Sequence, residues 1–269
     1  MRRVGVLGAG GRMGRTVCQA VMDDPDMELV AAIDPEFAGI DLRQLTGVES
    51  AGIQIASGPP ELERANAEVV VDFTVAEAAL ENMRWCASQG IHAVVGTTGL
   101  SREDLTDLED AFKVSAGNCV VAANFAIGAV LMARFAELAA PFMDGVEIIE
   151  LHHDNKLDAP SGTSLHIAKL IAESRERSSA PAFSQDPTTT TPVEGTRGGE
   201  GPGGLRIHSV RLPGLVAHHE VLFGSVGQVL AIRHDAFDRT SFMPGVLLAI
   251  RAVADTEGLT VGLGPLLGF

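Results

Sequence analysis

The sequence predicts an α/β protein in two parts: a doubly wound parallel sheet covered by helices, and a smaller α+β part with a mixed sheet. Short apolar runs alternate with helical patterns over the first 124 residues, which is typical of a parallel sheet. A glycine-rich turn separates the first strand from the first helix, as at the start of a strand–helix–strand unit. Beyond residue 124 the pattern changes, and short turns join the last strands.

Each element of the first part follows from its own pattern. Residues 4–7 form an apolar run before the glycine turn at 8–14, and a helical pattern follows at 15–22. Four more buried strands and two helices are expected, the strands at 29–33, 68–72, 92–95 and 119–122 and the helices at 76–88 and 102–116.

The second part begins with an expected helix at 128–140, a strand at 146–151 and a helix at 162–177. Ser161 or Asp158 can cap the second helix, since both side chains accept hydrogen bonds from backbone N–H groups. Three strands that run antiparallel to one another and a last helix are then expected at 205–211, 215–223, 228–234 and 241–255.

Between these elements, residues 178–204 are crowded with Pro, Thr and Gly, which predicts a long mobile loop that packs no core. The change of pattern places one domain at residues 1–124, completed by 239–269, and a second domain at 125–238.

Composition limits the classes of partner. The 35 acidic and 20 basic side chains give a net charge of −15. Because a polyanion needs a basic face, neither nucleic acid nor an anionic membrane surface is expected as a partner. No segment approaches the ~20 apolar residues needed to span a bilayer. Cys18, Cys86 and Cys119 are widely spaced and form no CxxC motif, which favours reduced thiols and a cytoplasmic protein.

The glycine turn is predicted to bind a dinucleotide. Gly8, Gly11 and Gly14 leave the backbone open where a pyrophosphate must approach the N-terminus of the next helix. Asp34 lies 20 residues after Gly14, at the end of the second strand, where a carboxylate accepts hydrogen bonds from the adenosine ribose.

The choice between NADH and NADPH depends on charge near that ribose. Asp34 repels a 2′-phosphate, and the next residue is Pro35 rather than an arginine, which favours NADH. Arg12 lies in the glycine turn and weakens this exclusion, so NADPH stays open as a second cofactor.

The most specific pattern is ELHHDNKLDAPSGT at residues 150–163. It places two histidines at the end of a strand and Ser-Gly-Thr at the start of a helix. The backbone N–H groups of Gly162 and Thr163, with the Thr163 hydroxyl, predict a cradle for a carboxylate. His152 titrates near neutral pH, as a proton-transfer group should, and Lys156 is a candidate proton donor or counter-charge for an anion.

A metal site is the alternative interpretation of His152 and His153. Adjacent residues on a strand point to opposite faces, so both rings cannot easily bind one ion, and no third ligand is evident in the sequence. No metal is therefore expected.

Five motifs carry a family resemblance, GAGGRMG at 8–14, VDFT at 71–74, GTTG at 96–99, AANFAIG at 122–128 and ELHHDNKLDAPSGT at 150–163. Together they closely resemble dihydrodipicolinate reductase, over a length that runs from residue 3 to the last helix. AHHEVLFG at 217–224 and RHDAFDRTSF at 233–242 are similar to segments of the actinobacterial members.

The resemblance implies a Rossmann-like nucleotide domain and a substrate domain. The residues that it assigns to the cofactor are Gly8, Ala9, Gly10, Gly11, Arg12 and Met13 at the pyrophosphate, Asp34 at the ribose, Gly96, Thr97 and Thr98 near the nicotinamide, and Ala122, Ala123, Asn124 and Phe125 closing over it. Those that it assigns to the two carboxylates of the substrate are His153, Lys156, Gly162 and Thr163. His152 and Lys156 are implied to transfer the proton. Actinobacterial members also have a basic residue at the position of Gly10, which this chain lacks.

The implied reaction is the NAD(P)H-dependent reduction of 4-hydroxy-tetrahydrodipicolinate or dihydrodipicolinate to tetrahydrodipicolinate, in the diaminopimelate branch of lysine biosynthesis. The resemblance also implies a homotetramer assembled through sheets of the second domain. Two alternatives are another Rossmann oxidoreductase, which the glycine turn alone allows, and a non-catalytic nucleotide sensor, which would be expected to have lost His152, Lys156 or Thr163.

Overall fold

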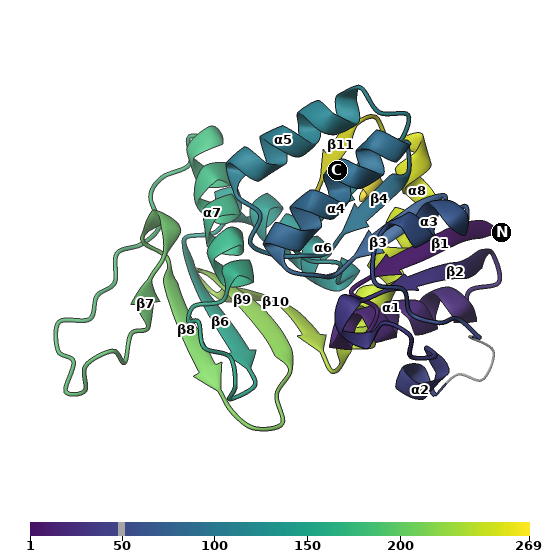
Figure 1. Cartoon of the computed structure of the whole chain (residues 1–269). Helices are drawn as coiled ribbons and strands as arrows, with labels where there is room; N and C mark the ends of the chain where they lie inside the picture. The colour runs from purple at the N-terminus through teal and green to yellow at the C-terminus, as the bar shows by residue number, and fades with distance from the viewer. Residues whose placement is uncertain (48–51) are drawn as a thin grey trace. The chain divides into compact units, whose positions relative to one another are not determined.

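The computed structural model of the chain describes residues 1–47 and 52–269, which form two compact units (Figure 1). The first unit consists of Met1–Ile127 and Arg239–Phe269, and the second of Gly128–Asp238.

The first unit is built on a parallel sheet with the strand order β11-β5-β4-β3-β1-β2. Its strands are β1 (Arg2–Leu7), β2 (Met27–Ile33), β3 (Val69–Asp72), β4 (His92–Val95), β5 (Cys119–Val121) and β11 (Leu259–Val261). Because β1 lies between β2 and β3, the winding direction reverses at β1, and ligands of doubly wound sheets bind beside the carboxyl end of such a strand. All five predicted strands are present, and β11 is an addition.

Helices cover both faces of this sheet, with α4 and α5 on one face and α1 and α8 on the other (Figure 1). The helices of the unit are α1 (Arg12–Asp23), α2 (Arg43–Thr46), α3 (Pro60–Arg64), α4 (Ala76–Gln89), α5 (Arg102–Lys113) and α8 (Met243–Ala252), with 3₁₀ turns at Pro35–Phe37, Arg239–Phe242, Val253–Asp255 and Pro265–Leu267. Met83, Leu108 and Phe112 are buried against Val70 and Val95 on the α4–α5 side. The doubly wound sheet predicted from the sequence is confirmed.

The second unit contains a mixed sheet with the order β10-β9-β6-β8-β7. Its strands are β6 (Gly145–His152), β7 (Gly199–Glu200), β8 (Arg206–Arg211), β9 (Ala217–Ser225) and β10 (Gln228–Ala236). The expectation that β8 and β9 are joined as neighbouring strands is wrong, since β6 lies between them and pairs parallel with β8 and antiparallel with β9. The connection crosses the end of β6, where the N–H of Leu212 donates to the carbonyl of His152 at 3.1 Å.

Two helices, α6 (Ile127–Ala139) and α7 (Gly162–Arg177), pack on one face of this sheet, and a 3₁₀ turn at Ala140–Phe142 follows α6. Ile167 and Ile171 of α7 are buried in the same core as Ile148 and Phe223 of the strands. Ser161 caps α7 by accepting a hydrogen bond from the N–H of Ser164, so Asp158 is not the cap.

Residues 178–204 pack more closely than predicted. The ring of Phe183 packs against the core of the second unit, and the Arg175 guanidinium lies 3.8 Å from its centroid. At the end of the segment, β7 pairs with β8, and a 3₁₀ turn at Pro202–Gly204 follows. The expectation that this segment packs no core is therefore wrong, because Phe183 is an apolar residue that the Pro and Thr pattern obscures.

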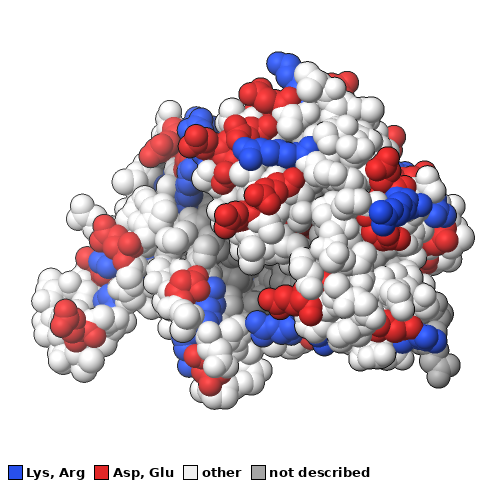
Figure 2. Space-filling model, viewed as in Figure 1, with Lys and Arg blue, Asp and Glu red and all other residues white. Residues whose placement is uncertain are grey.

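Charged side chains of both signs are interspersed on the face that Figure 2 shows, where Lys and Arg lie beside Asp and Glu. The ion pairs of the chain include Arg84 with Asp107 and Arg64 with Glu61. Within residues 1–47 and 52–269, no helix is long and apolar enough to cross a membrane.

Candidate functional site

The glycine turn lies at the carboxyl end of β1 and leads into α1. Gly8 has a φ of 75°, a backbone conformation that favours glycine. A Cβ at Gly14 would lie 2.0 Å from the carbonyl oxygen of Gly8, so a larger residue would push the helix away from the turn. Gly11 precedes α1 and provides no side-chain cap, which leaves the N–H groups of the first helical turn open to an anion.

Asp34 ties this turn to the end of β2. Its buried carboxylate accepts one hydrogen bond from the N–H of Gly10 at 3.0 Å and another from the N–H of Glu36 at 3.1 Å. These bonds use a different oxygen each, and each oxygen has a further lone pair. Asp34 therefore shapes the turn and still has capacity to accept from ribose hydroxyls.

The two arginines near the turn differ in their contacts and exposure. Arg15 donates from Nε to the carbonyl of Gly10 at 2.7 Å, and its guanidinium lies 5.4 Å from the ring centroid of Phe37. Arg12 is exposed, with Met13 half-buried beside it. A Cβ at Gly10 would lie 2.1 Å from the Phe37 ring, so a larger side chain fits there only if that ring moves.

A buried acid at the end of β3 organises the next part of the site, and its role is not evident from the sequence analysis. Asp72 is fully buried and accepts hydrogen bonds from the Thr74 N–H, the Thr74 hydroxyl, the Thr97 hydroxyl and the Asn82 amide, at 2.7–3.0 Å. Thr97 is thus a buried residue that joins the ends of β3 and β4. The aspartate within VDFT is the signal that could have revealed this role, since an acid at the end of an apolar strand needs partners.

Gly96 and the segment after β5 lie at the same edge of the sheet. A Cβ at Gly96 would lie 2.1 Å from the Phe73 ring, whose centroid is 5.9 Å from that of Phe125. The exposure of the neighbouring predicted residues varies, with Ala122 and Phe125 buried, Asn124 half-buried, and Thr98 and Ala123 exposed. The side chain of Asn124 accepts from the N–H of Ala126 at 2.9 Å, which fixes the turn into α6.

The predicted cofactor residues are therefore gathered at the carboxyl ends of β1, β2, β4 and β5. The uncapped start of α1, the close approach of Gly14 to Gly8 and the Asp34 carboxylate fit the pyrophosphate and ribose of a dinucleotide. The structure thus offers a matching group to the pyrophosphate and to one ribose of such a cofactor.

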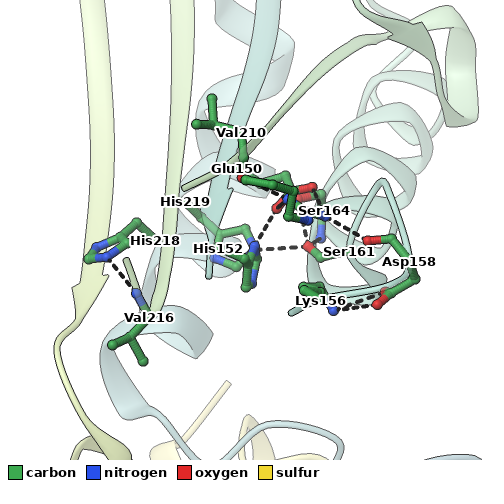
Figure 3. Close-up of polar contacts among 11 residues, drawn as sticks. Glu150, His152, Lys156, Asp158, Ser161, Ser164, Val210, Val216, His218 and His219 are labelled. Carbon is green, nitrogen blue, oxygen red and sulfur yellow. Dashed lines mark hydrogen bonds and ion pairs between the residues drawn. The ribbon is translucent and has the colours of Figure 1, made fainter. Parts of the chain in front are cut away.

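The second cluster lies in the second unit, between the end of β6 and the start of α7 (Figure 3). His152 and His219 meet edge to face with ring centroids 5.2 Å apart. Nε2 of His219 lies 3.0 Å from the Ser161 hydroxyl, which is also 3.0 Å from the Ser164 hydroxyl. Both histidines are buried, so this chain of polar contacts joins strand β9 to the N-terminus of α7.

The acid beneath His152 is Glu150, which is fully buried. Its Oε2 is hydrogen-bonded to Nδ1 of His152, and Arg211 donates to both of its oxygens, at 2.8 and 3.0 Å. Burial raises the pKa of Glu150, but hydrogen bonds from Arg211, Ser209 and His152 outweigh it and leave the pKa lowered.

Burial lowers the pKa of both histidines. Burial lowers the pKa of His152, while the hydrogen bond to Glu150 opposes that effect. Burial lowers the pKa of His219 to about 4, with a further contribution from the charge of His152. His219 is therefore neutral at pH 7.

Lys156 and the start of α7 provide groups for an anion. Nζ of Lys156 donates to both carboxylate oxygens of Asp158, at 2.7 and 2.9 Å (Figure 3). Ser161 accepts from the N–H of Ser164, which leaves the N–H groups of Gly162 and Thr163 pointing out of the helix end. A Cβ at Gly162 would meet nothing within 4 Å, so this helix end is open.

His152 is the last residue of β6 and is buried, whereas His153 follows the strand and is exposed. No group of three His, Cys, Asp or Glu residues within the described part of the chain is placed to hold a metal ion. Of the residues predicted to bind substrate or transfer the proton, the structure places His152, Lys156 and Gly162 between the end of β6 and the start of α7, with Thr163 next to Gly162. Glu150 and His219 contact the ring of His152, and Arg211 contacts Glu150; none of these three is singled out by the sequence analysis.

Comparisons with known proteins match nearly the whole chain. Two family models, described as the N-terminus and the C-terminus of dihydrodipicolinate reductase, match residues 2–125 and 128–267. A 4-hydroxy-tetrahydrodipicolinate reductase of Nocardia farcinica is 48% identical over 266 residues, 98% of each chain. One of Desulfitobacterium hafniense is 45% identical over 264 residues, 97% of each chain.

Solved structures of known proteins are also similar to this chain. The dipicolinate-bound dihydrodipicolinate reductase of Paenisporosarcina sp. TG-14 has a TM-score of 0.86 and 40% identity, and the match covers 98% of this chain and 99% of that one. An amine dehydrogenase of Mycobacterium smegmatis has a TM-score of 0.65 at 15% identity, over 96% of this chain and 94% of that one, which shows a shared fold alone.

Proposed function

The chain belongs to the dihydrodipicolinate reductase family, and from that premise we propose that it reduces 4-hydroxy-tetrahydrodipicolinate or dihydrodipicolinate to tetrahydrodipicolinate with a pyridine nucleotide. In this proposal the reaction belongs to the diaminopimelate branch of lysine biosynthesis and takes place in the cytoplasm. The first unit binds the cofactor and the second binds the substrate.

One observation carries the proposal. Lys156, the open N-terminus of α7 and the buried His152–Glu150 pair lie together at one end of β6. A small dicarboxylate needs cationic and N–H donors, and a reduction of its ring needs a proton donor beside them. The similar reductase of Paenisporosarcina sp. TG-14 is bound to dipicolinate, which is a dicarboxylate of this kind.

The cofactor residues are those at the edge of the parallel sheet. In the proposal the start of α1 holds the pyrophosphate, Asp34 the ribose, and residues 96–98 and 122–125 the nicotinamide half. When bound, the nicotinamide supplies the hydride. The chain's own contribution here is orientation, for which Gly8, Gly14 and Asp72 fix the backbone.

The proton is the contribution of the second unit. Nδ1 of His152 is hydrogen-bonded to Glu150, so its Nε2 is the ring nitrogen available to exchange a proton. Lys156 supplies positive charge where negative charge develops on the ring during reduction, and such a charge is worth more in a dry site than in water. Gly162 and Thr163 hold a substrate carboxylate through their N–H groups, and exposed His153 adds a donor at the edge of the site.

In this proposal the enzyme uses both nucleotides and prefers NADH to NADPH. Asp34 places a carboxylate where a 2′-phosphate would lie, and Pro35 offers no cation. Arg12 has no ion-pair partner in the part of the chain that the structure describes, which leaves its guanidinium free to offset that repulsion.

A homotetramer is part of the proposal. Leu151, Val210 and Leu222 lie on the sheet face opposite α6 and α7, as the register of β6, β8 and β9 shows. Val229 of β10 shares that face and is 73% exposed. An apolar sheet face of this kind is a surface for association with another copy. Light scattering on the purified protein should give four times the chain mass, and Val229→Asp should lower it.

The activity is tested by following the absorbance of NADH, and separately of NADPH, with substrate generated by the preceding aldolase reaction. We expect consumption that depends on the substrate and is faster with NADH. Absence of any substrate-dependent consumption would overturn the function, and equal rates would overturn only the preference.

A further inference from the structure

We infer that Glu150 is the positioning residue of His152, which it holds with the proton on Nδ1 so that Nε2 is directed to the reaction. This inference rests on the proposed function and assigns a role to a residue that the substrate does not need to touch.

The strand geometry places the two side chains together. Glu150 and His152 are two residues apart on β6, so they point to the same face of the sheet, the face covered by α6 and α7. Oε2 of Glu150 is hydrogen-bonded to Nδ1 of His152. An ionised carboxylate only accepts hydrogen bonds, so Nδ1 must carry the proton.

Glu150 is kept ionised and immobile by its other partners. Arg211 donates from Nη2 to Oε1 at 2.8 Å and from Nη1 to Oε2 at 3.0 Å. The same guanidinium is anchored by the carbonyls of Val210, at 2.8 Å, and Asp158, at 2.6 Å. A carboxylate held on both oxygens cannot rotate away from the ring, so Glu150 fixes the orientation of the His152 side chain through Nδ1.

The groups that face His152 come from several elements. Glu150 lies on its own strand, Arg211 on β8, His219 on β9 and Lys156 on the connection to α7. Burial, Lys156 and Arg211 lower the pKa of His152, and Glu150 raises it. Since His219 is neutral, Glu150 is the group in this set that stabilises a charged imidazole.

A second cluster of a glutamate, a histidine and an arginine lies on the same strand and its neighbours. Glu147 points to the opposite face of the sheet, where it lies 2.7 Å from Nε2 of His208 and forms an ion pair with Arg197. This cluster has the same residue types and lies away from the groups proposed to bind substrate. Glu147 is therefore a matched control for Glu150. Because it shares the sheet face proposed for association between copies, light scattering checks that its variant keeps the mass of the unmodified protein.

The experiment compares Glu150→Gln with Glu147→Gln. In the first variant the amide oxygen stays with Arg211 and the NH₂ group donates to Nδ1, so neutral His152 must carry its proton on Nε2. We expect kcat to fall by about 10²- to 10⁴-fold, the scale of general acid–base catalysis, with KM changed by no more than about threefold. Glu147→Gln should keep the kcat of the unmodified enzyme.

Two further readouts separate positioning from stability. Nitrogen-15 NMR of the His152 ring should show protonated Nδ1 in the unmodified enzyme and protonated Nε2 in Glu150→Gln. In the kcat profile the limb that reports loss of the His152 proton should move to lower pH in that variant, because the group that raises its pKa is gone. Glu150→Asp, which keeps the charge and shortens the reach, should retain part of the rate.

The results that would overturn the inference are distinct from those that would overturn the function. A Glu150→Gln variant with unchanged kcat, or an unmodified enzyme whose neutral His152 is protonated on Nε2, would refute the positioning role. If Glu150→Gln does not fold, the ring NMR of the unmodified enzyme and the rate of Glu150→Asp test the positioning role instead. An unmodified enzyme without substrate-dependent turnover would refute the function, while the ring NMR would still test the tautomer.

Discussion

Lys156 and Asp158 form an ion pair two residues apart, with Nζ of the lysine 2.7 and 2.9 Å from the two carboxylate oxygens. The Asp158 side chain is 61% exposed, while that of Lys156 is 21% exposed. A substrate carboxylate that binds Lys156 therefore competes with an acid already hydrogen-bonded to it.

Asp158→Asn should tighten substrate binding. An exposed ion pair is worth about 0.2–1 kcal/mol, so its removal should lower KM for the substrate by up to about fivefold. The backbone carbonyl of Asp158, which accepts from Arg211, is unaffected by the substitution. Steady-state kinetics check this, and a raised KM would contradict the competition.

Lys156→Ala should lower kcat by about 10²-fold or more and leave the Kd of NADH within about twofold. The lysine lies in the second unit, among the groups proposed to bind substrate, and outside the glycine turn. Lys169→Ala is the matched control, because Lys169 is an exposed lysine on α7 that pairs with Glu173. Rates by NADH absorbance and NADH binding by fluorescence are the measurements, and normal turnover would refute the role.

The sequence predicts the first sheet well because each buried strand is an uninterrupted apolar run. It does not predict β11, whose three residues lie between glycines and are too short to form a pattern. It also fails to place β8 beside β6, since strand neighbours are decided by tertiary pairing rather than by turns.

For the site, the sequence predicts the residues of the 150–163 motif but not the residues of other strands that contact them. Ser161, Lys156 and His152 lie within that one short segment, so their spacing along the sequence is enough to identify them. Arg211 and His219 come from other strands and reach the site only through the sheet register. Glu150 is the exception, because strand alternation alone places it on the same face as His152.

Stability should fall as the pH is lowered from about 6.5 to about 4, in part because of His219. An unfolded histidine binds its proton near pH 6.5, whereas burial lowers the pKa of folded His219 to about 4. Between those values the unfolded state binds more protons, so the free energy of unfolding falls as the pH falls, by about 3 kcal/mol for this residue.

Urea unfolding at several pH values should show that the free energy of unfolding depends less on pH in His219→Gln than in the unmodified protein. His153→Gln, which changes an exposed histidine, should keep the original dependence, and identical curves for both would contradict the assignment.

Arg12→Ala should change the choice of nucleotide. Loss of the exposed guanidinium should lower kcat/KM for NADPH by about fivefold or more and leave that for NADH within about twofold, because only NADPH carries the extra phosphate. Arg64→Ala removes an arginine that is 75% exposed and pairs with Glu61, and it should alter neither value. Equal losses with both nucleotides would assign Arg12 to the pyrophosphate instead.

Gly14→Ala should weaken cofactor binding by a backbone clash. Its Cβ would lie 2.0 Å from the Gly8 carbonyl oxygen, which cannot move without opening the turn that faces the pyrophosphate. Overpacking of this kind costs about 1–3 kcal/mol. Gly117→Ala is the matched control, since its Cβ would lie 2.5 Å from the carbonyl oxygen of Ile91, away from the turn. Both variants should lower Tm, but only Gly14→Ala should raise the Kd of NADH, by about tenfold, in a fluorescence titration below both Tm values. A similar rise in both variants would mean that the effect is a general loss of stability, and the turn would lose its assigned part in binding.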